Sequence, residues 1–348
     1  MQTIMAVMHD GIDEVQIRRA GEILKEGGLV AFPTETVYGL GGNALDADAS
    51  AKIYAAKGRP SDNPLIVHIA DWEAIEKIAA EIPPEAKKLA DAFWPGPLTM
   101  ILKKSDAVPK ATTGGLDTVA IRMPENEVAR ALIRAGGGYV AAPSANTSGR
   151  PSPTCAAHVA EDLSGKIEMI IDGGDAVIGL ESTIVDLTDG KPTILRPGYI
   201  NQQMLEEVLE EVELDRGLAE PDSGVHPKAP GMKYRHYAPK ADLIIVEGDA
   251  EKVREKINEL VSANLAEGKK TGVIGTDESL LYYKNGDVRS IGSRKEEITI
   301  ARHLYSILRE FDESDISVIY SESFETPKIG QAIMNRLIKA AGHQIIKV

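Results

Sequence analysis

The stretch LVAFPTETVYGLG (residues 29–41) decides how the fold begins. Its first four residues form a short apolar run that predicts a buried β-strand, and Pro33 ends that strand. Polar residues 34–36 follow at the carboxyl end of the strand. In open α/β sheets this edge is where ligands bind. A simple turn capped by hydroxyl groups is the alternative for the same residues.

Helical and strand patterns alternate outward from this stretch. Residues 13–27 carry apolar side chains at helical spacing. Apolar runs predict further strands at 65–69, 98–102, 118–123, 139–142, 169–172, 183–187 and 193–196. Helical patterns lie between several of these runs, at 46–56, 72–80, 84–93 and 125–135. The first 200 or so residues therefore predict a mixed α/β domain.

The composition changes after this region. Residues 213–240 are rich in proline, glycine and charge, which is typical of a linker or an ordered loop. From residue 243 onward, strands and helices alternate again and predict a small parallel sheet with helices on its faces. We therefore expect a domain at 10–212, a linker that covers the site at 213–240, and a C-terminal α/β domain at 241–348.

Charge and cysteine content exclude several classes of protein. The 348 residues include 39 Lys and Arg against 53 Asp and Glu, a net charge of −14, which argues against a wide nucleic-acid interface. The single cysteine, Cys155, rules out an internal disulfide and a cysteine-based metal site within one chain, and favours a reducing compartment. No apolar run reaches the roughly 18 residues that a membrane helix needs. We expect a cytoplasmic protein.

Cations stand beside small polar residues at several predicted loops and strand ends. Lys57 and Arg59 follow a helix, Arg122 lies inside an apolar strand, and Arg196 closes the last strand of the first domain. Such a set suits recognition of a polyanion such as a triphosphate. Each member also has a structural alternative, since cations commonly end helices and an arginine can reach from a strand to the sheet edge. His68 lies in a strand, where a histidine can have a structural or a catalytic role.

Six motifs, in this order, resemble those of the threonylcarbamoyl-AMP synthase family, whose catalytic domain is YrdC-like. They are PTETVYGLG (33–41), KGRPSDNPL (57–65), TVAIRMP (118–124), APSANTSG (142–149), ESTIVD (181–186) and LRPG (195–198). The segment APGMKYRHYAP (229–239) and the α/β tail resemble the longer, two-domain form of the family. The resemblance implies a twisted mixed sheet around a basic concave cavity, followed by a small Rossmann-like parallel α/β domain.

The same resemblance implies an activity. The protein would be a nucleotidyltransferase that condenses L-threonine, bicarbonate and ATP to L-threonylcarbamoyl-AMP and pyrophosphate. Mg2+ would accompany ATP, bound mostly by the phosphates, and the protein itself would hold no metal. The product would pass to a tRNA threonylcarbamoyl-transfer complex. The acidity of the chain argues against direct contact with tRNA.

The resemblance also assigns residues to ligands. Thr34, His68, Arg122 and Ser182 would hold L-threonine. ATP would be bound by Lys57, Arg59, Asn63, Thr118, Ser144, Asn146, Ser152 and Arg196, with Tyr234 closing over the site from the linker. Lys57 and Arg59 would be the catalytic residues, because they suit the charge that develops during phosphoryl transfer.

Two other functions compete with this one. An RNA-binding protein would use the basic cavity to grip a nucleic-acid backbone, but the sequence lacks a basic stripe interleaved with aromatic residues. A carbamoyl-transfer enzyme of the hydrogenase-maturation kind would need cysteine-rich zinc parts, which are missing here.

Overall fold

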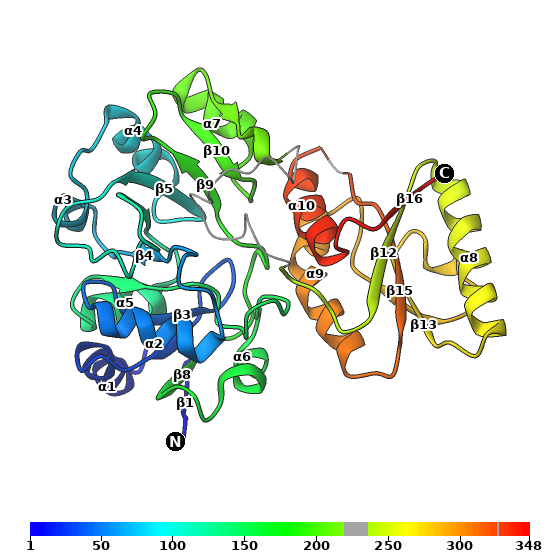
Figure 1. The fold of residues 1–348 in the computed structure, drawn as a ribbon, viewed down its shortest axis with the longest axis horizontal. Helices are drawn as coiled ribbons and strands as arrows, with labels where there is room; N and C mark the ends of the chain where they lie inside the picture. The colour runs from blue at the N-terminus through cyan, green and yellow to red at the C-terminus, as the bar shows by residue number, and fades with distance from the viewer. Residues whose placement is uncertain (219–235, 326) are drawn as a thin grey trace. The chain divides into compact units, whose positions relative to one another are not determined.

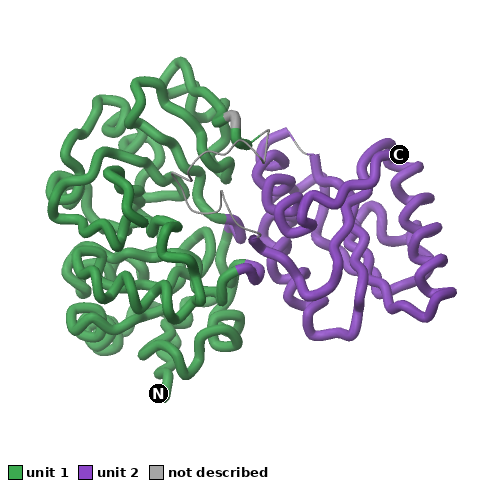
Figure 2. The backbone as a smooth tube through the Cα atoms, viewed as in Figure 1, with its two compact units in different colours: residues 1–148, 152–177, 181–233 green, residues 149–151, 178–180, 234–348 purple. Residues whose placement is uncertain are grey.

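The structure is a computed structural model and describes residues 1–218, 236–325 and 327–348. Contacts divide the chain into two compact units (Figure 2). Unit 1 holds the described chain up to residue 218, except for residues 149–151 and 178–180. Those two short segments belong with residues 236–348 to unit 2. The predicted boundaries at residues 212 and 240 stay a prediction.

Unit 1 is built on an 11-stranded sheet that contains parallel and antiparallel pairs, as the sequence led us to expect. In sheet order the strands are β1 (Ile4–Val7), β8 (Met169–Asp172), β2 (Val30–Phe32), β3 (Gly39–Asn43), β7 (Val140–Ala141), β4 (Ile66–His68), β6 (Thr118–Arg122), β5 (Leu98–Lys103), β9 (Thr183–Asp186), β10 (Thr193–Arg196) and β11 (Glu213–Leu214). The helices are α1 (Glu14–Lys25), α2 (Ala47–Lys57), η1 (Trp72–Ala74), α3 (Ile75–Ile78), α4 (Pro84–Phe93), α5 (Glu127–Ala135), α6 (Ala156–Leu163), α7 (Gln202–Leu209) and η2 (Arg216–Leu218).

The central strands of unit 1 present different residues to the two faces of the sheet. Val67, Ile121 and Met100 are paired across β4, β6 and β5, and they belong to the main hydrophobic core. The intervening residues project from the opposite face, because side chains alternate along a strand. The sheet therefore keeps one face of these strands for the core and leaves the other for the predicted site.

Unit 2 is a five-stranded sheet in which all pairs are parallel. Its strands, in sheet order, are β14 (Asp287–Ser290), β13 (Thr271–Gly275), β15 (Val318–Glu322), β12 (Asp242–Glu247) and β16 (Ile345–Lys347). Its helices are α8 (Ala250–Ala266), η3 (Leu280–Tyr282), α9 (Glu297–Asp312) and α10 (Gly330–Ala340). Figure 1 shows α8 on one face of this sheet and α9 and α10 on the other. The parallel α/β arrangement predicted from the sequence is present.

Some elements differ from the sequence-based expectation. Strand β3 was not predicted, because its residues GLGGN are rich in glycine and carry little strand signal. The helix expected at 72–80 is a short 3-10 turn followed by the four-residue α3.

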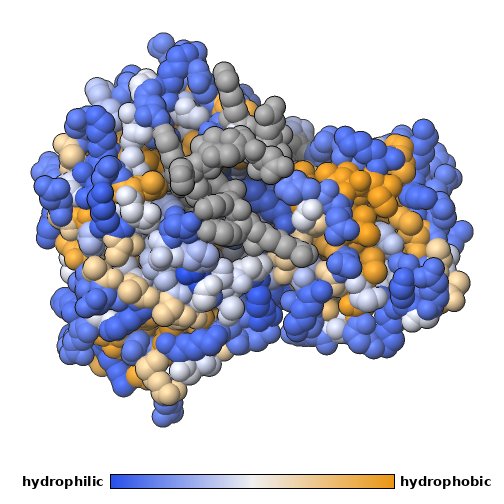
Figure 3. All heavy atoms as spheres, in the orientation of Figure 1, coloured by the Kyte–Doolittle hydropathy of each residue, from blue (hydrophilic) through white to orange (hydrophobic). Residues whose placement is uncertain are grey.

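None of the helices among the described residues is both long and apolar enough to cross a bilayer. Hydrophilic residues cover much of the face drawn in Figure 3.

We expect Gly21→Ala to destabilise unit 1. A Cβ atom at Gly21 of α1 would lie 2.6 Å from the carbonyl carbon and oxygen of Ala135, at the end of α5. Overpacking of this kind costs about 1–3 kcal/mol, which exceeds the gain of up to about 1 kcal/mol from replacing a helical glycine. Urea denaturation followed by circular dichroism measures the loss. The exposed Glu22→Ala on the same helix should change the free energy of unfolding by less than about 0.5 kcal/mol. An unchanged or raised stability in Gly21→Ala would contradict the tight helix contact.

Candidate active site

One row of paired residues crosses six neighbouring strands of the unit 1 sheet. The row consists of Val140, His68, Arg122, Thr99, Ile184 and Arg196, on β7, β4, β6, β5, β9 and β10. Residues paired on adjacent strands project from the same face of a sheet. The row therefore brings His68, Arg122 and Arg196 to one face, although they are far apart in the sequence.

An apolar floor lies beside this row on the same face. It consists of the buried residues Ile66, Ala120, Ile101 and Leu195, which pack with Ile184 of the row itself. On the far side of the floor, Thr118 begins β6, four residues or about 13 Å of strand before Arg122. The face is therefore polar at both ends and apolar between them.

Most of the predicted nucleotide residues gather where β4 and β6 begin. Arg59 and Asn63 precede β4, and Thr118 is the first residue of β6. Because β7 runs antiparallel to β4, the loop after β7 reaches the same edge and carries Ser144 and Asn146. Strand direction thus assembles residues from three separate motifs.

Lys57 connects the end of α2 to the loop after β7. Gly58 ends α2 with φ of 62°, a left-handed conformation that glycine adopts without strain. The buried Nζ of Lys57 donates hydrogen bonds to the carbonyl oxygens of Ser144 and Asn146, each at 2.5 Å. The Ser144 hydroxyl in turn donates to Asn146 Oδ1 at 2.5 Å. Carbonyl and amide oxygens therefore hold this buried ammonium group in place.

The loop before β4 contains a buried acceptor. The guanidinium of Arg59 donates to the carbonyl oxygens of Asn63 and Pro64, at 3.4 and 3.2 Å. The Asn63 side chain is buried, and its Oδ1 has no hydrogen-bond partner among the described residues. Burying an unsatisfied polar atom costs about 1–3 kcal/mol, so a ligand that donates a hydrogen bond here would recover that energy.

At the other ends of these strands, where β4 and β6 finish, Arg122 forms a buried ion pair with Glu35. Nη2 of Arg122 lies 2.5 Å from Glu35 Oε1, and Nη1 donates to Thr36 Oγ1 at 2.8 Å. Both charged side chains are about 95% buried. Glu35 Oε2 is also buried and has no hydrogen-bond partner among the described residues. The site thus contains a paired cation and, next to it, an unused acceptor.

Thr34 shapes the loop that carries Glu35. Its hydroxyl donates to the carbonyl oxygen of Val37 at 2.6 Å, and it accepts from the backbone N–H groups of Thr36 and Val37 at 3.2 Å. Its Oγ1 also lies 2.9 Å from Thr36 Oγ1. This hydroxyl-capped turn is the structural alternative that the sequence left open. The same turn aims Glu35 and Thr36 at Arg122.

His68 is buried and neutral. Burial, with a further contribution from the charge of Arg122, lowers the pKa of His68 from its ordinary value of 6.5 to about 3. Its Nδ1 lies 3.1 Å from the carbonyl oxygen of Ile66, and its ring packs edge-on against Phe32 with centroids 6.0 Å apart. An uncharged imidazole beside a guanidinium can donate a hydrogen bond to a ligand, or accept one from it, without adding a second positive charge to the site.

Ser182 and Arg196 are held together where β9 begins and β10 ends. Arg196 donates from Nε to the carbonyl oxygen of Ser182 at 3.0 Å and from Nη2 to its hydroxyl at 3.2 Å. The same hydroxyl lies 2.7 Å from Thr99 Oγ1. Gly198 permits this closeness, because a Cβ there would lie 2.4 Å from the backbone nitrogen of Thr183. Arg196, predicted to contact ATP, therefore lies with the predicted threonine residues.

Two predicted residues remain to be placed. The buried hydroxyl of Ser152 donates to Glu181 Oε1 at 2.6 Å, which brings Ser152 next to the ESTIVD motif. Tyr234 lies outside the described residues, and so does much of the predicted linker.

The sequence placed Glu35 and Thr36 at a strand end where ligands bind and Glu181 inside a quoted motif, but assigned none of them to a ligand. Thr99 had no signal, because only the register of β5 against β6 places it beside Arg122. Among the described residues, no group of three or more His, Cys, Asp or Glu side chains is arranged to hold a metal ion.

The lowered pKa of His68 predicts a pH dependence of stability. Between about pH 3 and pH 6.5 the unfolded chain binds the proton that the folded chain excludes, so stability is lost as the pH falls through this window. Urea denaturation at about pH 7 and about pH 5 should show a difference that is about 2 kcal/mol smaller in His68→Gln than in the parent. His343→Asn, at an exposed histidine, should keep the parental difference. Equal pH dependence in all three proteins would contradict a neutral buried His68.

Family models match almost the whole chain. One model, described as Telomere recombination, matches residues 22–198, and a second, described as Threonylcarbamoyl-AMP synthase, C-terminal domain, matches residues 200–342.

Known proteins agree with these models. The threonylcarbamoyl-AMP synthase of Pyrococcus abyssi is 53% identical over 99% of this chain and 100% of its own length. The Bacillus subtilis protein of the same name is 50% identical over 96% of this chain and 95% of its own length. A crystal structure of the Pyrococcus abyssi protein complexed with L-threonine superposes with a TM-score of 0.94, at 51% identity, over 99% of this chain and 100% of that one. This chain therefore belongs to the threonylcarbamoyl-AMP synthase family.

Proposed function

We propose that this protein is an L-threonylcarbamoyladenylate synthase, which condenses L-threonine, bicarbonate and ATP and releases pyrophosphate. The observation that carries the proposal is the single sheet face with buried Arg122 at one end and the Lys57–Arg59 loop at the other. That arrangement offers one place for an amino acid and another for a triphosphate. The relatives named above, which match over nearly their full lengths, support it.

L-threonine would bind at Thr34, His68, Arg122 and Ser182. The guanidinium of Arg122 suits the threonine carboxylate, which would join or replace Glu35 in the existing ion pair. Glu35 Oε2, which has no partner in the part of the chain that the structure describes, would accept an N–H from the threonine amine. The crystal structure of the Pyrococcus abyssi relative complexed with L-threonine supports an amino acid site in this fold.

ATP would bind toward the other edge. Its contacts would be Lys57, Arg59, Asn63, Thr118, Ser144, Asn146, Ser152 and Arg196. Arg196 bonds to Ser182, so its position suits the boundary between the two substrates, where the α-phosphate must meet the amino acid. Asn63 Oδ1 would accept a hydrogen bond from the nucleotide.

The chemistry needs positioning more than a protein nucleophile. The threonine amine attacks the carbon of CO2 and loses a proton, or attacks the carbon of bicarbonate with loss of water, and either route gives a carbamate. A carbamate oxygen then attacks the α-phosphorus of ATP, and the bond to the β-phosphate oxygen breaks as pyrophosphate leaves. Lys57, Arg59 and Arg196 would stabilise the negative charge that builds up during transfer. Exclusion of water protects the carbamate and the mixed anhydride of the product from hydrolysis.

The remaining parts of the proposal concern cofactor and partners. Mg2+ would accompany the triphosphate, with phosphate oxygens and water as its main ligands. The catalytic domain would span residues 10–212, followed by the linker at 213–240 and the C-terminal domain at 241–348. Proteins that transfer the threonylcarbamoyl group to tRNA would consume the product, and we expect the reaction in the cytoplasm.

Replacing Arg59 tests the nucleotide end of the site. Arg59→Gln removes a cation that would face the phosphates, so pyrophosphate release should fall at least about tenfold, as expected from a lost charge-assisted contact. Arg134→Gln, an exposed arginine on α5 paired with Asp71, is the matched control and should keep the parental rate. In the parent, release must require threonine and bicarbonate together. Normal turnover in Arg59→Gln would remove this residue from the mechanism.

Replacing Arg122 tests the amino acid end. Arg122→Lys keeps the positive charge but loses the planar fork, so the KM for threonine should rise at least about tenfold. The KM for ATP should change little, because Arg122 lies at the opposite end of the face from Thr118. Steady-state kinetics with each substrate varied in turn separates the two effects. A raised KM for ATP with an unchanged KM for threonine would reverse the assignment of the two ends.

A further inference from the structure

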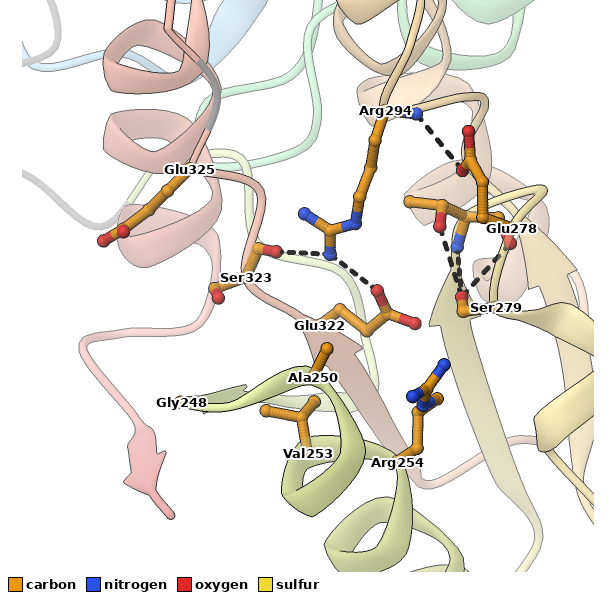
Figure 4. A pocket seen from close by; sticks show the side chains of 11 residues that line it. Gly248, Ala250, Val253, Arg254, Glu278, Ser279, Arg294, Glu322, Ser323 and Glu325 are labelled. Carbon is orange, nitrogen blue, oxygen red and sulfur yellow. Dashed lines mark hydrogen bonds and ion pairs between the residues drawn. The ribbon is translucent and has the colours of Figure 1, made fainter.

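The carboxyl ends of β12, β13 and β15 surround a cavity of about 400 Å³ in unit 2 (Figure 4). Gly248 follows β12, Thr276 follows β13 and Ser323 follows β15, and all three line the cavity. The volume is in the range of pockets that hold small metabolites and mononucleotides. Every residue that lines it belongs to unit 2, and none of them belongs to the proposed synthase site.

The cavity occupies the place where the chain reverses its direction across the sheet. Strands β12 and β15 are neighbours in the sheet. From β12 the chain passes through α8 to β13, which lies beyond β15. From β15 it passes through α10 to β16, which lies beyond β12 in the opposite direction. Adjacent strands thus send their helices to opposite faces and leave a crevice between them. Ligands of open α/β sheets bind in this crevice, although position alone identifies no ligand.

Arg254 reaches into the cavity from α8. Its guanidinium lies 4.0 Å from the centroid of the Tyr282 ring, which supports it from one side. Within the described part of the chain this guanidinium forms no ion pair and no hydrogen bond. In Figure 4 it points toward the space between Glu322 and Ser279. Its five N–H donors are therefore available to an anion.

Arg294 enters from the other side and is fixed in place. Its Nη2 donates to Glu322 Oε2 at 2.6 Å and to the carbonyl oxygen of Ser323 at 2.8 Å. Tyr283 donates to the other oxygen of Glu322 at 2.6 Å, so both oxygens of that carboxylate are in use. Nε and Nη1 of Arg294 have no hydrogen-bond partner in the described ranges. Arg294 thus offers oriented donors without having to reorganise.

The start of α8 does not provide the anion site. The Asp249 carboxylate accepts from the backbone N–H groups of Glu251 and Lys252, at 3.0 and 3.4 Å. These groups are the ones that would otherwise receive a phosphate at a helix start. An anion in the cavity must therefore rely on the two arginines.

Glu278 supplies an acceptor on the wall formed after β13. Its Oε1 accepts from the Ser293 hydroxyl at 2.5 Å, and its Oε2 from the backbone N–H of Arg294 at 3.2 Å. Burial opposes ionisation of this group, but the hydrogen bonds from Ser293 and from the backbone outweigh it and lower the pKa to about 2. An ionised carboxylate has about four acceptor positions, so Glu278 can still accept hydroxyl groups of a ligand.

We propose that this cavity binds a small phosphorylated molecule of mononucleotide size, with its phosphate on Arg254 and Arg294 and its sugar hydroxyls on Glu278. Guanidinium groups bind phosphate through paired, charge-assisted hydrogen bonds. Carboxylates suit the hydroxyls of a pentose, as the acidic residue of dinucleotide-binding folds does. This site is independent of the proposed synthase reaction.

Calorimetric titration of the full chain with ribose 5-phosphate tests the proposal. We expect saturable binding to the parent, at least tenfold weaker binding of ribose, and at least tenfold weaker binding of ribose 5-phosphate to Arg254→Gln. Lys256→Gln removes a positive charge from the same helix, outside the cavity, and should leave binding unchanged. Arg294→Gln should also weaken binding at least tenfold.

Reciprocal variants separate this site from the synthase site. Arg59→Gln should bind ribose 5-phosphate as the parent does, and Arg254→Gln should release pyrophosphate at the parental rate. The proposal is overturned if the parent does not bind ribose 5-phosphate, if Arg254→Gln binds it normally, or if Arg59→Gln abolishes binding. Equal affinity for ribose and ribose 5-phosphate would exclude the arginines as a phosphate site.

Discussion

The buried ion pair between Arg122 and Glu35 is the constraint on which the site of unit 1 depends. A guanidinium in the middle of the sheet is costly to bury unless an opposite charge and hydrogen bonds accompany it. The partner comes from the loop after β2, four positions away in the sheet order. That loop must therefore fold across the face of the sheet, and the hydroxyl-capped turn of Thr34 gives it the required shape.

The distribution of charge explains how an acidic protein can handle anionic substrates. The net charge is −14, yet Lys57, Arg122 and Arg196 are all buried. Backbone and amide oxygens hold Lys57, and Ser182 accepts from Arg196. Backbone and hydroxyl dipoles orient Lys57 and Arg196, whereas the Glu35 carboxylate pairs with Arg122. A low-dielectric surrounding strengthens the attraction of such buried charges for a ligand. A few buried cations in a chain with this net charge suit a small anionic substrate better than a long polyanion.

Much of this architecture was predictable from the sequence. The motifs predicted where strands end, and the alternation of strands and helices after residue 243 predicted the parallel sheet of unit 2. Two kinds of feature were not predicted. The glycine-rich β3 lacks the side chains that signal a strand, and it is held by pairing with β2 and β7. Thr99 joins the site only through the register of β5 with β6, which is set by contacts between distant residues and not by local pattern.

The row of paired residues across six strands has a consequence for how such a protein can diverge. Shifting one strand by a single residue turns every one of its side chains to the opposite face. An insertion or deletion within β4, β5 or β6 would therefore send His68, Thr99 or Arg122 into the hydrophobic core. Loops between the motifs are free to lengthen or shorten, whereas these strands can change only by substitution. Insertions and deletions must therefore accumulate outside the row. The residues of the row can serve as fixed reference positions when distant members of the family are aligned.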